Sequence, residues 1–584
     1  MWKRMLPALA VLLLVLAACG PAATATPQPQ ATPTQQAAPK PTTAPSGGGT
    51  AAPTATPKPQ PTAAPAVTAK SGGVLRIAND NREPRGWDAW SWKDGARDLR
   101  VRANLNFSQL FTLATDPAVP CQLVFRPELA ETWKWLSPEL LEVKLRQGVK
   151  FHNKPPVNGR EMTSDDVVWA ATQFLKDNVI RGMEPYAPHV KKIEATDRYT
   201  VRIQLDGPLP PFLTEALVSE YGALIVPKDA TDDKGRWGDP YKSYIGTGPF
   251  TFKEHVPGVR TVFLKHQDYF KKGLPYFDEV DYLIVPEMST QVASLRSGAL
   301  DMVYGPIPAP MATPLKQVAN VVVNGCPQLS TISGRFYFRT DQPPFNDVRM
   351  RRAIQMAFDR EGLVKSILQG QGVTAPHYPN AVNKIYVSWE ELPPETLQWV
   401  KYDPQRAKQL VAEAGYANGL TIGLKLSTGY ASPYRELSEA TVGFLKEVGI
   451  TVKPHFVTAV EWAAYSNSGD IGDDQLAFGQ IASLPAPTSQ FSAWSSKGPV
   501  LSNRSRINDP ELDKMLDQLL VETDMDKMTA LFKKMETRLI DQAWEPNPGV
   551  FPLEFNGFQK YVKGFNGGHQ YLATTYIERL WFDK

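Results

Sequence analysis

The sequence carries little net charge, few cysteines and few of the residue patterns that mark catalytic sites. Its 584 residues include 63 Lys or Arg and 60 Asp or Glu, so the formal net charge is +3. Binding to a phosphate backbone usually needs a strongly basic domain or a clustered basic stripe, so we expect no nucleic-acid partner. Residues 1–70 contain five basic and no acidic residues, which leaves residues 71–584 slightly acidic.

Motifs of common enzyme classes are absent as well. The sequence has no Gly-x-x-x-x-Gly-Lys-Ser/Thr loop, no His-Glu-x-x-His pair and no Gly-x-Ser-x-Gly elbow. These patterns mark phosphate-binding loops, zinc peptidases and serine hydrolases. No cysteine pair has the spacing of a zinc site, and the seven histidines are scattered. We therefore expect a protein that is not an enzyme and that holds no cofactor and no metal.

The N-terminus has the features of an export signal. Lys3 and Arg4 precede an apolar run, Leu6–Leu16, that is too short to span a bilayer as a helix. The run ends in Leu-Ala-Ala-Cys, which resembles the bacterial lipobox and would make Cys19 the lipidated first residue of the mature chain. We expect residues 1–18 to be a lipoprotein signal peptide; an ordinary cleaved signal with an incidental cysteine is the alternative.

Residues 20–70 are rich in Pro, Thr, Ala and Gln. Twelve of the 52 prolines lie there, and the stretch contains no aromatic residue. Such a composition cannot bury enough apolar surface to offset the entropy of ordering. We expect residues 19–70 to be the lipidated cysteine and a disordered tether, and the protein to be an extracytoplasmic, membrane-anchored lipoprotein. A spacer without further function remains the alternative.

Only two cysteines follow Cys19. Cys121 and Cys326 lie 205 positions apart, and an exported chain can join such a pair in a disulfide. Two buried thiols are the alternative, and spacing alone does not decide between them.

Hydrophobic periodicity in the remaining 514 residues predicts an α/β fold with more than one lobe. Residues 278–285 alternate as a strand, 290–297 form a helical face with Ser289 as cap, and 299–304 form the next strand, which makes a β-α-β unit. Asp403 and Pro404 are typical of a helix start. Residues 420–426 and 450–457 alternate as strands, with a helical stripe between them.

Tryptophan supplies the clearest candidate for ligand contact. Trp87, Trp90 and Trp92 follow the first predicted strand closely, and loops at the carboxyl ends of strands are where open α/β sheets bind ligands. Indole faces suit sugar rings, apolar side chains and cations. The alternative is that these residues are simply core.

Six segments of the body occur in a recognisable order: Gly72–Ala78, Leu129–Trp133, Val143–His152, Met162–Val168, Gly246–Phe250 and Phe345–Arg360. This ordered set resembles the family 5 extracellular solute-binding proteins, which include the oligopeptide- and dipeptide-binding lipoproteins of ABC importers. The resemblance spans nearly all of residues 71–584.

The resemblance implies two lobes joined by a hinge, with the ligand between them. Lobe I would comprise residues 71–105, 235–330 and 549–584, an inserted subdomain would fill 106–234, and lobe II would be 331–548. The implied function is a monomer that captures an extracellular solute, of the peptide class, and delivers it to an ABC permease. The resemblance implies no cofactor.

One stretch departs from the family pattern. Peptide-binding members carry an Asp that pairs with the peptide's α-ammonium, whereas Ser483 stands at the matching position here. Because a buried ammonium without a countercharge is costly, the ligand is either a peptide held in another way or a neutral solute such as an oligosaccharide. Asp473 or Asp474 would substitute if the match were shifted. The predicted contact residues are Asn79, Trp87, Trp90, Gly479, Gln480, Ile481, Ser483 and Trp494.

Two other functions fit the same scaffold. An exported hydrolase would need a nucleophile or metal constellation that the sequence does not show, and turnover assays would reveal it. A sensory or adhesive surface protein would use the same cleft without a permease.

Overall fold

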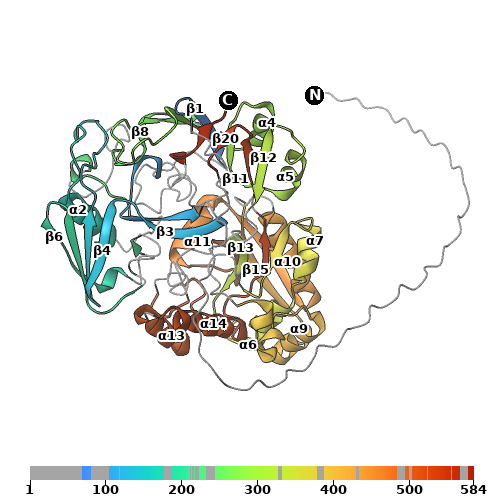
Figure 1. The fold of residues 1–584 in the computed structure, drawn as a ribbon. Helices are drawn as coiled ribbons and strands as arrows, with labels where there is room; N and C mark the ends of the chain where they lie inside the picture. The colour runs from blue at the N-terminus through green and yellow to red at the C-terminus, as the bar shows by residue number, and fades with distance from the viewer. Residues whose placement is uncertain are drawn as a thin grey trace, which may run out of the picture. The chain divides into compact units, whose positions relative to one another are not determined.

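Three sheets of four or more strands occur in the part of the chain that the computed structural model describes. The described residues are 69–79, 104–116, 119–176, 186–210, 212, 216–217, 223–231, 244–325, 332–377, 387–428, 433–482, 494–498, 503–522, 524–553, 555–565 and 577–584. They form the α/β architecture that the sequence predicts (Figure 1). Cys19, Cys326 and the side chain of Cys121 lie outside them, so the lipidation and disulfide predictions remain predictions.

The largest sheet has seven strands in the order β12-β19-β11-β1-β10-β9-β8. Helices α4 and α5 pack against β11, β12 and β19 (Figure 1). Apolar side chains of these elements form a buried cluster that includes Leu295, Val303, Ile307, Leu315 and Phe555. The elements are β1 (Val74–Asn79), β8 (Phe250–Val256), β9 (Arg260–Lys265), β10 (Glu279–Ile284), α4 (Met288–Ser297), β11 (Met302–Ile307), α5 (Ala309–Leu315), β12 (Val321–Gly325) and β19 (Phe555–Gln559).

The predicted β-α-β unit is present as β10-α4-β11, but β1 lies between its two strands. β1 pairs in parallel with β10 over its full length and with β11 at Ile77 and Ala78. Helix α4 ends at Gly298, which adopts the left-handed conformation expected of a C-cap. β11 begins at Met302 rather than at 299, because the Leu300 N–H turns back and donates to Ser294 O of α4. The helix starts at Met288, so Ser289 is not its cap.

A second sheet has the order β4-β5-β7-β6 and is covered by α2. Thr163 N donates to Asp166 Oδ2 at 2.9 Å, which is one of the two hydrogen bonds of a helix-capping box. Its elements are β4 (Ala130–Ser137), β5 (Leu140–Leu145), α2 (Ser164–Lys176), β6 (Val190–Asp197) and β7 (Thr200–Leu205), while β2 (Phe111–Asp116) and β3 (Val119–Pro127) pair with each other in a separate sheet.

The segment at residues 246–249 is packed against the chain at residue 106. A Cβ on Gly246 would lie 2.2 Å from Asn106 O, so only glycine fits there. Two buried histidines meet the carbonyl of Gly248: His152 Nε2 and His266 Nδ1 each lie 3.1 Å from that oxygen, and Gly246 N donates to His152 Nδ1 at 3.3 Å. Burial lowers the pKa of both rings.

A third sheet has the order β13-β17-β15-β16. Its strands and helices α6, α9 and α10 share one apolar core, while α13 and α14 form another. The elements are β13 (Ile332–Phe338), α6 (Val348–Met356), α7 (Arg360–Ser366), α8 (Pro394–Leu397), α9 (Pro404–Val411), β15 (Leu420–Ser427), α10 (Tyr434–Glu447), β16 (Ile450–Val457), α11 (Ala459–Ser468), β17 (Leu476–Ala482), α13 (Pro510–Val521) and α14 (Met525–Asp541).

The chain passes between the seven-stranded sheet and the third sheet twice. It leaves after β12, enters β13, and returns through β18 (Val550–Pro552) to β19. β18 pairs with β14 (Gly372–Thr374) of the segment that follows α7. β20 (Val562–Lys563) and β21 (Trp581–Phe582) pair near the end of the chain. The residue boundaries predicted for the two lobes and the inserted subdomain remain predictions.

Candidate functional site

The predicted contact residues fall in different parts of the structure. Gly479, Gln480 and Ile481 lie in β17, and Asn79 is the last residue of β1, paired with Ile284 of β10. Trp87, Trp90 and Ser483 lie outside the described residues, as do the side chains of Asn79, Gln480 and Ile481. Trp494 is described and is 1% exposed.

β17 presents two different faces because alternate residues point to opposite sides of a sheet. It pairs with β13 so that Arg335 lies opposite Gly479 and Phe336 lies opposite Phe478. Phe336 and Phe478 face the apolar core with ring centroids 5.2 Å apart. Arg335 and Gly479 therefore share the other face, which α11 covers with Trp462.

Gly479 allows aromatic rings to approach the strand. A Cβ at this position would lie 2.7 Å from Tyr337 Cε2 and 2.8 Å from Trp462 Cζ2. Distances below 3.0 Å do not occur for real Cβ atoms, so the two rings occupy the space that a side chain would need. Tyr465 extends the cluster, with its ring centroid 5.1 Å from that of Trp462.

Two guanidinium groups lie against Tyr337. Arg335 Cζ is 4.5 Å from the centre of the Tyr337 ring, a cation–π distance. Arg504 Nη1 donates to the Tyr337 hydroxyl at 3.0 Å, and Arg504 Nε donates to Ser466 O at 3.1 Å. Burial acts to raise the pKa of Tyr337, but the charges of Arg335 and Arg504 outweigh burial, so the net shift of the pKa is downward.

Glu545 joins Trp494 to this cluster. Its carboxylate accepts hydrogen bonds from Arg335 Nη1 and from Trp494 Nε1, and Ser505 Oγ lies 3.4 Å from Oε1. The side chains of Arg335 and Glu545 are 2% and 0% exposed. Gly479 and Trp494, both predicted from the sequence, are thus joined through Arg335 and Glu545, neither of which the sequence analysis singled out.

Trp494 is covered by protein on both its polar and apolar parts. Its indole N–H binds Glu545, and its ring centroid lies 5.4 Å from that of His377. In this structure Trp494 is buried in the apolar cluster of α13 and α14, and its contact with a ligand remains a prediction.

The alternative carboxylates considered from the sequence lie just before the first residue of β17. Asp474 precedes the strand, where its Oδ2 is 2.9 Å from His455 Nδ1 and 3.5 Å from Lys425 Nζ. A strand rises about 3.3 Å per residue, so Leu476 and Ala482 are about 20 Å apart. The substitution of Asp473 or Asp474 for the family's carboxylate therefore remains a prediction.

The described residues show neither a metal site nor a membrane span. Among them, no three His, Cys, Asp or Glu side chains gather in a way that could hold a metal ion. None of their helices combines the length and apolar character needed to cross a membrane.

Comparison with known proteins identifies the family. Residues 124–501 match the model of the bacterial extracellular solute-binding proteins, family 5. The chain is 28% identical over 457 residues to heme-binding protein A of Haemophilus influenzae, covering 73% of this chain and 80% of that protein. It is 25% identical over 492 residues to the periplasmic oligopeptide-binding protein OppA of Escherichia coli, covering 78% and 84%.

The fold is also similar to those of solved periplasmic binding proteins. The periplasmic binding protein DppA of Helicobacter pylori, solved with the peptide STSA, superposes with a TM-score of 0.73 at 22% identity, over 88% of this chain and 99% of that chain. The fold is therefore that of the two-lobed periplasmic binding proteins. Since the family model covers more than half of the chain, this protein belongs to the family 5 extracellular solute-binding proteins of bacteria.

Proposed function

We propose that the protein is the lipid-anchored solute-binding subunit of an ABC importer, which captures a peptide between its two lobes and delivers it to a permease. Family membership supports the binding function, and the names of relatives such as OppA support the peptide class. The Leu-Ala-Ala-Cys sequence before residue 20 supports the anchor. The protein acts as a monomer and catalyses no reaction.

The structure bears on how the ligand is held. In the described part of β17 and its surroundings, Glu545 is bound to Arg335 and Trp494, and Asp474 lies near the opposite end of the strand. Position 483 carries serine. We infer that β17 supplies no carboxylate for a peptide's α-ammonium, and that the ligand is a peptide bound without that ion pair. A neutral solute such as an oligosaccharide is the second candidate, for the same reason.

Calorimetry with peptides tests this mechanism. Tri- to pentapeptides and their N-acetylated forms are titrated into the purified protein. If no ammonium pocket exists, acetylation changes the affinity by less than about threefold, well below the effect of losing a buried ion pair. Tight binding that N-acetylation abolishes would contradict the proposal. Mass spectrometry of ligand released from the freshly purified protein then separates peptides from oligosaccharides.

The anchor has its own test. Labelled fatty acid is expected to be incorporated into the wild-type chain and not into Cys19→Ser. Incorporation into the variant would place the lipid elsewhere and would refute Cys19 as the anchor. Binding of ligand is expected to be the same in both chains, so the two halves of the proposal can fail separately.

A further inference from the structure

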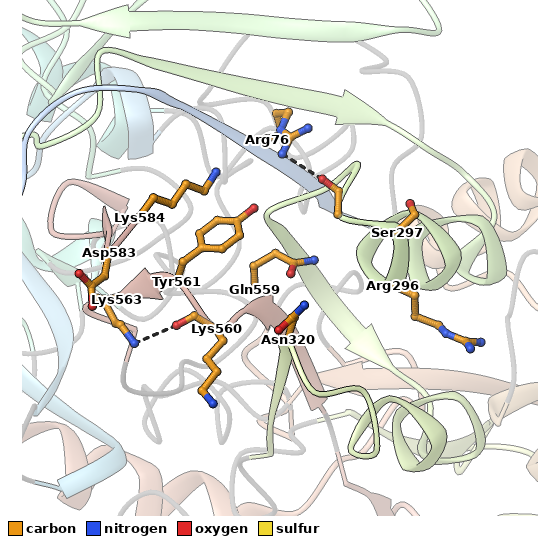
Figure 2. A pocket seen from close by; sticks show the side chains of 11 residues that line it. Arg76, Arg296, Ser297, Asn320, Gln559, Lys560, Tyr561, Lys563, Asp583 and Lys584 are labelled. Atoms are coloured by element: carbon orange, nitrogen blue, oxygen red, sulfur yellow. Dashed lines mark hydrogen bonds between the residues drawn. The ribbon is translucent and has the colours of Figure 1, made fainter.

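A polar pocket of about 640 Å³ opens on the seven-stranded sheet, away from β17 (Figure 2). Its walls come from β1, the end of α4, the residue before β12, and the segment from β19 to β20 together with the last two residues. None of the described residues of the third sheet lines it. The pocket is therefore separate from the candidate site.

The floor of the pocket is a fixed network around Asp301. This carboxylate is fully buried and accepts hydrogen bonds from Arg76 N at 2.8 Å, Arg76 Nε at 3.0 Å and Tyr561 OH at 2.6 Å. Arg76 Nη2 also donates to Gly298 O at 3.1 Å. Gln559 is buried and its Nε2 donates to the carbonyls of Leu295 and Leu300. The negative charge and the carbonyls at the end of α4 are thus already engaged by the protein.

The rim of the pocket is basic. Its positively charged side chains are Arg296, Lys560, Lys563 and Lys584 (Figure 2). Within the described part of the chain, none of these four side chains forms an ion pair with an acidic side chain. Lys563 Nζ donates to the main-chain oxygen of Lys560 at 2.8 Å, and Lys584 Nζ lies 3.9 Å from the centre of the Tyr561 ring.

Asp583, the one acidic side chain among the described residues that line the pocket, has a cation beside it. Lys70 Nζ lies 3.3 Å from Asp583 Oδ1 and 3.0 Å from Lys584 O. The carboxylates of Asp301 and Asp583 are each paired with a cation, so the basic side chains of the rim give the pocket an excess of positive charge. Lysines at such a concave site suit a compact, multiply charged anion, and Asn320 adds a neutral hydrogen-bonding group.

We propose that this pocket binds phosphate-bearing groups and is a second ligand site, independent of the transported solute. The phosphate belongs either to a soluble phosphate compound or to the headgroup of an anionic lipid. Lipid is within reach, because the proposed anchor at Cys19 is 51 residues from Lys70, which joins the body beside the pocket. Fully extended, that segment could span up to about 170 Å.

The test compares two variants with the same change in net charge. Arg296→Gln/Lys560→Gln/Lys563→Gln removes three charges from the pocket rim, whereas Lys191→Gln/Lys408→Gln/Lys453→Gln removes three exposed charges elsewhere. All six side chains are at the surface or partly exposed, so both variants are expected to keep the wild-type thermal unfolding midpoint. Arg296→Gln alone serves if the pocket variant unfolds early.

Pyrophosphate titrated into the full-length chain by calorimetry probes the soluble source. Flotation with vesicles of phosphatidylcholine, with and without about 30% phosphatidylglycerol, probes the lipid source. Comparing the two vesicle compositions subtracts the contribution of the anchor. A basic side chain at an anionic surface contributes about fivefold in affinity. The pocket variant is therefore expected to lose affinity by tenfold or more in one of the two assays. The control variant is expected to lose affinity by at most about fivefold in the same assay.

The two assays distinguish a soluble anion from a lipid headgroup. A loss confined to pyrophosphate identifies a soluble anion, and a loss confined to the phosphatidylglycerol-dependent binding identifies a lipid headgroup. Equal losses in the pocket and control variants, or no binding of either probe by the wild type, overturn the proposal. Peptide binding at the proposed cleft is measured in parallel and is expected to be unchanged in both variants.

Discussion

Substituting Glu545 by glutamine is expected to lower the free energy of unfolding by about 3–5 kcal/mol. The side chains of Glu545 and Arg335 are 0% and 2% exposed, so the substitution leaves a buried guanidinium without its carboxylate. Glutamine has nearly the same volume and keeps an oxygen that can accept the indole N–H of Trp494. The loss therefore reports the charge pair rather than a cavity or a missing hydrogen-bond acceptor.

Urea unfolding followed by tryptophan fluorescence measures the change in the free energy of unfolding. It equals the shift in the midpoint urea concentration multiplied by the slope of the free energy of unfolding against urea concentration. Glu413→Gln is the matched control, because its pair with Arg406 is exposed, with 47% and 38% of the two side chains accessible. An exposed pair contributes at most about 1 kcal/mol.

The double variant Arg335→Met/Glu545→Met removes both charges and is expected to be more stable than Glu545→Gln, because an apolar pair leaves no buried charge uncompensated. A free energy of unfolding of Glu545→Gln within 1 kcal/mol of the wild-type value would contradict this expectation. A double variant less stable than Glu545→Gln would contradict it as well.

Three further changes test other parts of the structure. Gly479→Ala is expected to lower the free energy of unfolding by about 1–3 kcal/mol, because its methyl group collides with two aromatic rings. Gly443→Ala, in α10 with open space around it, should raise the free energy of unfolding by about 0.5–1 kcal/mol. Thermal unfolding of the two variants measures both changes. The lowered pKa values of His152 and His266 mean that the unfolded chain binds more protons, so stability should be full above about pH 6.5 and fall as the pH drops below it. A urea midpoint that is independent of pH between 7.5 and 5 in the wild type, or equally dependent in His266→Gln, would contradict this. Asp347→Ala removes the oxygen at the start of α6 that accepts the hydrogen bond of Arg349 N at 2.8 Å. The substitution should lower the free energy of unfolding by about 1 kcal/mol in the same assay. An unchanged free energy of unfolding would show that the cap contributes nothing.

Local patterns in the sequence predicted local structure well. The strand at Ile450–Val457 has the predicted bounds, and Asp403 caps the helix that begins at Pro404, accepting a hydrogen bond from Arg406 N. The insertion of β1 between β10 and β11 was not predicted. Alternation and capping describe one segment at a time, whereas the order of strands in a sheet depends on segments about 200 residues apart.

The candidate site shows the same limit. Gly479 was predicted through family resemblance, but Arg335 and Glu545 are 210 positions apart and nothing in their spacing brings them together. A signal was present: β13 reads Ile-Ser-Gly-Arg-Phe-Tyr-Phe, and an arginine within so aromatic a strand needs a buried partner. Identifying the partner as Glu545 required the fold.

The position of β19 has a consequence for how the protein is made. This strand lies between β12 and β11, and β12 is joined to the rest of the sheet only through it. Residues 74 and 559 are 485 positions apart, which corresponds to roughly 25–100 s of synthesis at typical rates. The seven-stranded sheet is complete only once β19 has been made, so β12 has no partner in this sheet until almost the whole chain is available.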